Sequence, residues 1–245
     1  MVDASSADLA TDFGVVAVLD DDADQAKTVK FQLEDVGINP LIVDLDEVPT
    51  LERAIGVVNE RAEAVICDVQ LNNLHPGMQF HGAQLVADLV ADHGVPCVLT
   101  TGFVQDVGML VRPHRHLIPV LLTREEIEDP DVLVEGFSRC RNEIDHGPDP
   151  ERRTRRVPLF IERVGLFETG VALDARVGGW AHKTPMRFPA TMLGGEYAKK
   201  ERAAELVGKV FFARVNLGAE REPDLFLEGP EPEFIDPADL DLHFE

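Results

Sequence analysis

The sequence of 245 residues is poor in cysteine and in long apolar runs, and each shortage excludes a class of protein. Its three cysteines (Cys67, Cys97 and Cys140) are too few for a disulfide framework and odd in number, so we expect them to be reduced. No apolar run approaches the roughly 20 residues that span a bilayer. The first residues also lack the basic and apolar pattern of a signal peptide. We therefore expect a cytoplasmic protein without a membrane span.

Basic residues are scarce in the first 150 positions, which hold 9 Lys and Arg against 28 Asp and Glu, a net of −19. Such an excess of negative charge argues against contact with nucleic acid or an anionic membrane. Residues 151–219 carry the opposite sign, with 13 basic and 7 acidic residues and a net of +6. Residues 220–245 return to −9, with 1 basic and 10 acidic residues. An anionic ligand is therefore expected in the middle segment.

The first half contains apolar runs that are bounded by turn residues and separated by helical patterns. The runs are residues 14–19, 41–43, 64–67, 96–100 and 116–122, and the helical patterns are residues 23–36, 51–61, 80–92 and 131–144. This alternation is typical of an α/β protein with a parallel sheet. In such sheets the functional residues gather at the carboxyl ends of the strands. We therefore expect four side chains at one edge, those of Asp20, Asp21, Asp68 and Thr101.

Crowded carboxylates repel one another and stay ionised only when a cation lies among them. Oxygen ligands of this kind suit Mg²⁺, which is usually held by one or two carboxylates and several waters. An aspartate at the end of a strand also caps the following helix, but that role explains one of these residues rather than all of them. The sequence predicts a magnesium site formed by Asp20, Asp21 and Asp68.

Residues 14–146 resemble the receiver domain of bacterial two-component response regulators in motif and order. The Asp20-Asp21 pair is similar to the acidic pair after the first strand, Asp68 to the phosphorylated aspartate, and Thr101 to the switch threonine. The resemblance implies a doubly wound, flavodoxin-like sheet of five parallel strands. It also implies Mg²⁺, with the backbone carbonyl of Gln70 as a further ligand, and phosphate donated to Asp68 by a histidine kinase or phosphotransfer protein.

One residue that receivers carry is absent, the lysine at the end of the fifth strand, because no lysine lies between Lys30 and Lys183. Counting from Thr101 puts Thr123 and Arg124 at its position. Threonine has no charge, and arginine is a larger planar fork that is not equivalent to lysine. We therefore expect an atypical response regulator with Thr123 in the site. The alternative is a pseudo-receiver that works by protein contact without phosphorylation.

A second domain is predicted after the break at residues 146–150, where glycine and two prolines interrupt the pattern. The boundaries are therefore residues 1–147 for the receiver-like domain and 148–245 for a β-rich effector domain with an acidic tail from residue 220. Five short strands (residues 157–162, 170–177, 185–192, 209–217 and 224–228) and one helix (residues 196–207) suggest a small barrel or sandwich. No helix-turn-helix pattern is present, so direct DNA binding is not expected.

The expected partner of the second domain is a downstream protein, and a homodimer is left open. Catalysis beyond phosphoryl transfer to the protein itself is not indicated. Weak patterns in this domain resemble the PilZ domain, a β-barrel that binds cyclic di-GMP. The residues that the resemblance implies for the ligand are Arg152, Arg156, Asp174 and Gly179. A basic linker followed by an ordinary glycine turn explains the same residues, and we favour that interpretation.

Overall fold

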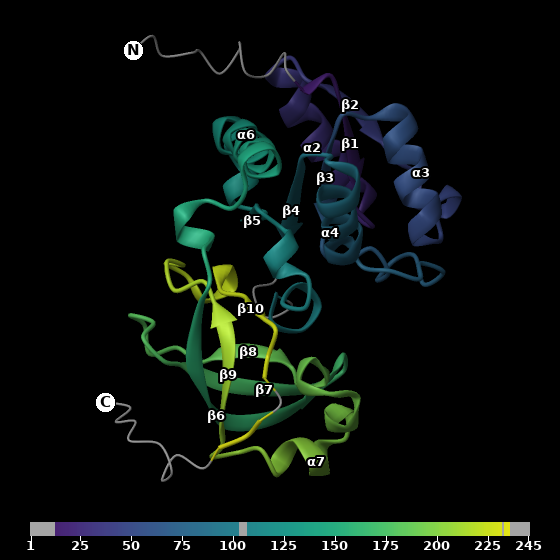
Figure 1. Ribbon diagram of the computed structural model, residues 1–245. Coiled ribbons are helices and arrows are strands. Elements are labelled where there is room, and N and C mark those ends of the chain that lie inside the picture. The colour runs from purple at the N-terminus through teal and green to yellow at the C-terminus, as the bar shows by residue number, and fades with distance from the viewer. Residues whose placement is uncertain (1–12, 103–106, 232, 236–245) are drawn as a thin grey trace. The chain divides into compact units, whose positions relative to one another are not determined.

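The computed structural model describes residues 13–102, 107–231 and 233–235. The chain divides into two compact units, and each unit has its own sheet (Figure 1). The first unit comprises residues 1–104 and 117–147, and the second comprises residues 105–116 and 148–245. The second unit is therefore built from two separate stretches of chain. Residues 236–245 of the predicted acidic tail lie outside the described residues.

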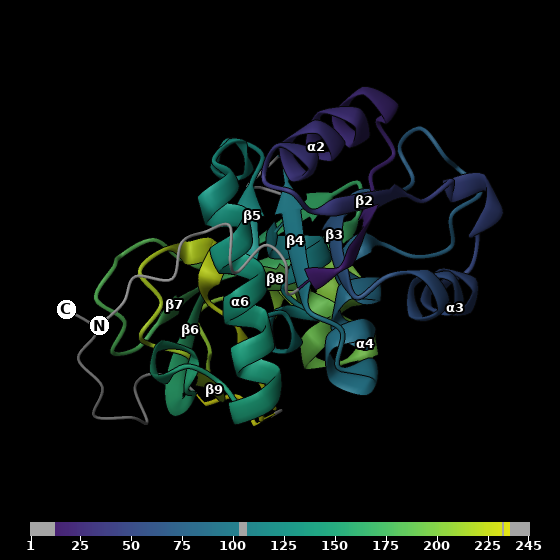
Figure 2. The same ribbon diagram turned by 90° about the horizontal axis from the view of Figure 1, so that it is seen from above.

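The sheet of the first unit has five parallel strands in the order β2-β1-β3-β4-β5 (Figure 2). The strands are β1 Val15–Leu19, β2 Asn39–Ile42, β3 Ala64–Asp68, β4 Cys97–Thr101 and β5 Leu121–Thr123. This is the flavodoxin-like order of a doubly wound fold, so the predicted fold class is confirmed. Strands β3 and β4 are buried along their whole length, which explains their continuous apolar sequences.

Within its described residues, the first unit contains the α-helices α2 Ala23–Asp35, α3 Leu51–Arg61, α4 Gly82–His93 and α6 Pro130–His146. Three of them begin at a side chain that accepts hydrogen bonds from the first turn, which are Asp22, Thr50 and Asp129. Helices α2 and α6 share a hydrophobic core with β1, β3 and β4. None of the helices in the described part of the chain is long and apolar enough to cross a membrane.

The fifth strand is shorter than predicted. Residues 116–122 were expected to be extended, but β5 begins only at Leu121 and residues Arg115–Leu117 form a 3-10 helix. Pro119 has no backbone N–H to donate to a strand ladder, and its ring restricts the residue before it. The prediction is therefore wrong for the residues before Leu121.

The second unit is a curled antiparallel sheet with the order β10-β9-β6-β7-β8. Its strands are β6 Arg155–Phe167, β7 Gly170–Val177, β8 Met186–Pro189, β9 Val210–Val215 and β10 Leu227–Glu228. Alternate residues of these strands face one core, in which Leu159, Leu173 and Phe211 are wholly buried. The prediction of a mostly β second domain is confirmed.

The helix predicted for residues 196–207 is longer than the α-helix observed there. Residues Gly195–Ala198 form a 3-10 helix, and the α-helix α7 covers only Lys200–Ala204. No side chain caps the start of α7 at Lys199. At the other end Gly208, with φ +83°, turns the chain into β9 by a backbone conformation that favours glycine.

Residues 107–116 stand where a covering helix would connect β4 to β5, yet they belong to the second unit. Val107–Val111 form a π-helical turn, closed by a hydrogen bond of 2.9 Å from the Arg112 amide to the Val107 carbonyl. Gly108 lies so close to Arg187 of β8 that an added Cβ would be 2.8 Å from the arginine Cγ. Single π-helical turns are rare and occur often at functional sites.

The Arg112 side chain is wholly buried and fixes this segment in the second unit. Its guanidinium donates to the carbonyl of Arg187 at 3.0 Å, to the carbonyl of Glu222 at 3.2 Å and to the carbonyl of Leu225. It also pairs with the Glu222 carboxylate. Arg115 is also buried, and its Nη2 donates a hydrogen bond of 3.1 Å to Asp224 Oδ1.

Candidate functional site

The predicted acidic residues lie at the carboxyl ends of two neighbouring strands. Asp68 is the last residue of β3, and Asp20 and Asp21 follow β1, which pairs with β3 through Leu19 and Cys67. Asp21 and Asp68 are only 7% and 4% exposed. The charges of all three carboxylates act on one another. The structure therefore brings these residues together as the sequence predicts.

Backbone amides hold each of the three carboxylates in place. The Asp22 amide donates to Asp20 Oδ1 at 2.9 Å, and the Gln70 amide donates to Asp68 Oδ2 at 2.8 Å. The amide of Leu74 donates to Asp21 Oδ2 at 3.1 Å, so the loop after β3 returns to the end of β1. Hydrogen bonds of this kind favour the ionised carboxylates and fix their orientation.

A guanidinium group faces two of these carboxylates. Arg124, the residue after β5, donates through Nη2 to Asp68 Oδ1 at 3.2 Å, and the same nitrogen lies 3.6 Å from Asp20 Oδ1. Its amide donates to the carbonyl of Thr101 at 3.1 Å, which ties it to the end of β4. Arg124 thus supplies a cation at the edge where receivers have lysine.

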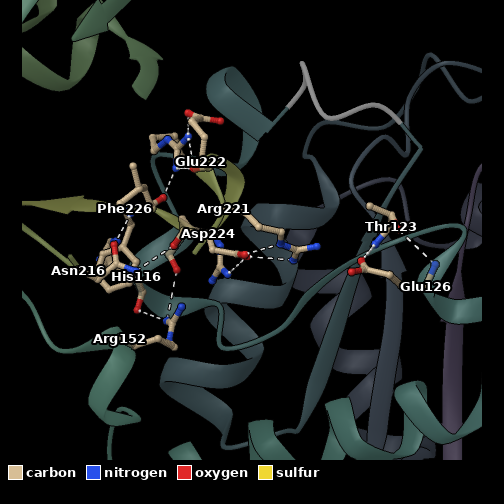
Figure 3. Close-up of polar contacts among 12 residues, drawn as sticks. His116, Thr123, Glu126, Arg152, Asn216, Arg221, Glu222, Asp224 and Phe226 are labelled. Atoms are coloured by element: carbon tan, nitrogen blue, oxygen red, sulfur yellow. Dashed lines mark hydrogen bonds and ion pairs between the residues drawn. The ribbon is translucent and has the colours of Figure 1, made fainter. Parts of the chain in front are cut away.

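Thr123, the other residue at the lysine position, takes part in a different arrangement. Its hydroxyl accepts from the Glu126 amide at 3.2 Å, and the Glu126 carboxylate accepts from the Thr123 amide at 2.7 Å (Figure 3). This reciprocal pair is a capping box, here at the start of the 3-10 helix Glu126–Glu128. Its sequence signature, threonine followed three residues later by glutamate, is visible at residues 123–126 and indicates the capping role. Among these contacts, those of Thr123 lead to Glu126, whereas those of Arg124 lead to Asp68 and Asp20.

Burial and mutual repulsion weaken the acidity of the cluster. Burial first, and then the charges of Asp68 and Asp21, raise the pKa of Asp20 to about 7, although the Asp22 amide and Arg124 act in the opposite direction. Burial also raises the pKa of Asp68, against the Gln70 amide and Arg124. For Arg124, burial lowers the pKa, but attraction to Asp68 and Asp20 outweighs it and the pKa rises. The cluster holds more negative charge than one guanidinium neutralises.

Two glycines give the site room. An added Cβ at Gly82, the first residue of α4, would lie 1.8 Å from the Asp68 carbonyl oxygen, so only glycine lets the helix approach the end of β3. An added Cβ at Gly102 would lie 3.4 Å from Cδ of Arg124. Thr101 itself is 4% exposed and is the last residue of β4. The sequence predicts Thr101 in the site, but it does not predict the close approach of Gly82.

The residues present fit a magnesium ion in their chemistry. Asp20, Asp21, Asp68 and the Gln70 carbonyl would supply oxygen ligands, and a cation would relieve the repulsion by Asp68 and Asp21 that, after burial, raises the pKa of Asp20. In the described part of the chain, no group of three or more His, Cys, Asp or Glu side chains is placed to hold a metal ion by itself. An ion here would therefore need the Gln70 carbonyl and water among its ligands.

The four residues predicted for an anionic ligand in the second unit have separate partners. Arg152 is buried and donates to the carbonyl of His116 at 3.1 Å, whereas Arg156 is exposed and forms a fork with Glu231 at 2.7 Å. Asp174 accepts two bonds from Arg187, at 2.8 and 3.0 Å. Gly179 has a φ of +80°, as a glycine turn requires. These hydrogen bonds do not join the four residues into one site.

Arg112 and Arg115 are important residues that sequence reasoning misses. They lie in Leu-Val-Arg-Pro-His-Arg, where an apolar run gives way to basic residues next to a proline. Arginine in such a place is usually exposed. Nothing local signals that both side chains are buried with partners more than 70 residues away in the chain.

No model of a known protein family matches this sequence. No curated protein matches it either. Solved structures are similar to its first half. A response regulator receiver domain protein from Clostridium thermocellum has 14% identity, covering 54% of this chain and 97% of its own, with a TM-score of 0.41.

The receiver domain of a modulated diguanylate cyclase from Desulfovibrio desulfuricans has 22% identity, covering 54% and 96%, with a TM-score of 0.43. The anti-anti-sigma factor PhyR from Bartonella quintana has 18% identity, covering 52% of this chain and 46% of its own, with a TM-score of 0.36. The sheet order of the first unit, β2-β1-β3-β4-β5, is the flavodoxin-like order that the resemblance of residues 14–146 to response regulator receivers implies.

Proposed function

We propose that this protein is a response regulator in which Asp68 accepts a phosphoryl group and Arg124 replaces the lysine of ordinary receivers. The donor would be a histidine kinase or a phosphotransfer protein. The observation that carries the proposal is the contact of Arg124 with both Asp68 and Asp20, at 3.2 and 3.6 Å. A buried carboxylate with a guanidinium on one oxygen has the charges that phosphoryl transfer needs, because positive charge stabilises the transferred group.

The two oxygens of Asp68 have different hydrogen-bond partners. Oδ2 is held by the Gln70 amide, and Oδ1 faces Arg124. One carboxylate oxygen attacks phosphorus and forms an O–P bond, while the P–N bond to the donor histidine breaks and its electron pair remains on the imidazole nitrogen. Arg124 then moves from the carboxylate to the phosphoryl oxygens, which its planar fork can bind with two bonds. Magnesium, when bound by the acidic residues, would add positive charge at the same group.

The proposal assigns the output to the second unit, through residues 105–116. The chain runs from Thr101 and Gly102 in the site to a π-helical turn that is part of the second unit. Arg112 is wholly buried among carbonyl groups and Glu222, so this turn moves with the second unit. A displacement at the end of β4 would therefore be transmitted along the chain itself. We propose no catalysis beyond phosphoryl transfer to Asp68 and its hydrolysis.

Phosphorylation by acetyl phosphate in the presence of Mg²⁺, followed by intact mass spectrometry, tests the proposal. We expect the wild-type protein to gain one phosphoryl group and Asp68→Asn to gain none. Arg124→Gln should slow the reaction roughly tenfold or more, because a hydrogen bond to a charged group contributes about 1.5–3 kcal/mol. Arg124→Lys should retain most of the rate. Arg61→Gln removes the same charge from the last turn of α3 and serves as the control.

Two outcomes would contradict this function. If the wild-type protein gains no phosphoryl group with acetyl phosphate or with any histidine kinase of its own genome, the pseudo-receiver alternative is favoured. If Arg124→Gln reacts as fast as Arg61→Gln, the guanidinium does not replace the lysine. Thr123→Lys should not increase the rate, because it removes the hydroxyl that accepts from the Glu126 amide.

A further inference from the structure

The second unit contains a pocket of about 430 Å³ that none of the roles above uses. This volume lies within the range of about 300–1,000 Å³ that is usual for small-molecule sites. All the lining residues belong to the second unit, and they come from its two separate stretches of chain. They are His116, Pro148, Arg152, Arg153, Thr154, Arg214, Phe226 and Glu228.

The pocket is positively charged although the chain as a whole carries a net charge of −22. Three arginines, Arg152, Arg153 and Arg214, line it together with one acidic residue, Glu228. An acidic protein repels anions from most of its surface, so a concave site with a basic excess is where a small anion would collect.

Arg152 forms the rigid part of the pocket. It is 5% exposed, and its Nη2 donates to the carbonyls of Arg115 and His116 at 3.4 and 3.1 Å (Figure 3). Its guanidinium also lies 4.9 Å from the ring centroid of Phe226, a cation–π contact. A buried arginine that carbonyls and an aromatic ring hold in place is preorganised for a charged ligand.

Arg214 forms the adaptable part. Its contacts are long, with Nε 3.1 Å from Thr154 Oγ1, Nη2 3.4 Å from the Thr154 carbonyl and Nε 3.9 Å from Glu228. The side chain is 60% exposed, so such contacts hold it weakly. The Thr154 hydroxyl donates to Glu228 at 3.4 Å. An anion in the pocket could draw Arg214 toward itself while Glu228 keeps its bond to Thr154.

His116 adds a polar group with no partner. Its Nδ1 is buried, and it has no hydrogen-bond partner among the described residues. Burial lowers the pKa of His116, with Arg152 acting in the same direction and Glu228 against it. A neutral imidazole with an unused nitrogen can donate its N–H to a ligand oxygen.

We propose that this pocket binds a small phosphoanion, with Arg152, Arg153 and Arg214 as the binding groups and His116 as a further donor. Several guanidinium groups from different segments suit a tetrahedral group with three or more oxygens better than a single carboxylate, which one fork satisfies. The site is distinct from the set that the PilZ resemblance implies, because Arg156, Asp174 and Gly179 do not line it. It does not depend on phosphorylation of Asp68.

Isothermal calorimetry on the full chain, with pyrophosphate and with ADP as probes, tests the inference. We expect saturable binding of at least one probe that weakens as salt rises. Arg214→Gln and Arg153→Gln should each weaken it about tenfold or more, because each removes a charge-assisted hydrogen bond. Glu228→Gln should strengthen binding, because it removes the one carboxylate of the pocket. Equal affinity for the two probes would identify the phosphate group as the whole recognised unit, and tighter binding of ADP would identify a nucleotide.

The control is Arg155→Gln, which removes the same charge from the neighbouring strand β6 at an exposed position outside the pocket. It should leave the affinity within about twofold. If neither probe binds at millimolar concentration, the inference is overturned. It is also overturned if Arg155→Gln weakens binding as much as Arg214→Gln, since general surface charge would then explain the effect. A shift of the His116 ring signals in NMR spectra on addition of the probe should accompany binding.

Discussion

The two units bury charges of opposite sign and satisfy them in different ways. The first unit buries Asp21 and Asp68 at the end of its sheet, where a single guanidinium and backbone amides oppose their charge. The second unit buries Arg112, Arg115 and Arg152. These arginines are surrounded by carbonyl oxygens and by partner carboxylates that the fold itself provides.

This difference distinguishes charged groups of a functional site from charged groups that stabilise the fold. Burial raises the pKa of Asp20 and Asp68 because the compensation is incomplete, which is typical of groups that await a ligand. Burial also lowers the pKa of Arg115, to about 9, but the residue remains charged at neutral pH and is paired with Asp224. Incomplete compensation of Asp20 and Asp68 thus indicates function, and the carbonyls and carboxylates around Arg112 and Arg115 indicate a structural role.

The largest effect on stability is expected when a buried and paired arginine is replaced. Arg112→Met should destabilise the second unit by about 3–5 kcal/mol, because it leaves Glu222 and several carbonyls without their buried donor. Urea denaturation followed by tryptophan fluorescence measures it, because the single tryptophan, Trp180, is buried in the second unit. Arg202→Met, in the exposed pair with Glu205, should change stability by less than about 1 kcal/mol. Equal effects of the two variants would show that burial gives the contacts of Arg112 no more weight than an exposed ion pair has.

The next effect concerns the space around Asp68. Gly82→Ala should cost the first unit about 1–3 kcal/mol, since its Cβ would overlap the Asp68 carbonyl oxygen at 1.8 Å. Gly56 lies inside α3, and no heavy atom is within 4 Å of an added Cβ. Gly56→Ala should therefore stabilise the first unit by about 0.5–1 kcal/mol. Denaturation followed by far-ultraviolet circular dichroism gives both values. A stabilising Gly82→Ala would show that α4 does not approach the site as described.

The pH dependence of the two units should have opposite signs. The pKa of Asp20 is raised from 3.8 to about 7 on folding, so its contribution to stability is present below pH 4 and is lost as pH rises through 7. The pKa of Asp224 is lowered, despite burial, by Arg221 and Arg115, so its contribution is present above pH 4 and is lost at lower pH. Hydrogen exchange in β1 and β3, and Trp180 fluorescence, follow the two units separately. Asp20→Asn or added Mg²⁺ should reduce the pH dependence of the first unit's stability. An unchanged pH dependence would show that Asp20 is not its source.

The smallest effect is expected at an exposed pair in the second unit. Arg156 forms a fork with Glu231 at 2.7 Å and lies 4.0 Å from the ring centroid of Phe212, but its side chain is 55% exposed. Arg156→Gln should leave the urea midpoint unchanged within error, because water screens such pairs. It should also leave pyrophosphate binding unchanged. A clear loss of binding would return Arg156 to the ligand site that the PilZ resemblance implies.

Much of the first unit can be predicted because its signals are local. Buried parallel strands read as apolar runs, and the residue that ends each run is the residue at the edge of the sheet, as for Asp68 and Thr101. Counting along the chain also places Arg124 near the site. The choice between Thr123 and Arg124 depends on a capping box with Glu126, which is a short motif and is recognisable once it is sought.

The rest depends on contacts that are distant in the sequence. The burial of Arg112 requires Glu222 and Leu225, more than 100 residues further along the chain. The approach of Gly82 to Asp68 is likewise a matter of tertiary packing, and no local pattern shows it. In the second unit the strands follow local alternation, but the pairing of Asp174 with Arg187 follows from the register of β7 and β8. The contact of Arg152 with the His116 carbonyl joins residues that are 36 positions apart in the chain.

The excursion of residues 105–116 has a consequence for how such a protein can change in evolution. Domains joined by one linker can be exchanged by a single recombination event. Here the second unit takes in a stretch that is encoded inside the first, so one crossover at residue 147 would leave behind the π-helical turn and Arg112. A new effector would have to arrive together with a matching segment after β4. The two units of this chain should therefore be inherited as a pair.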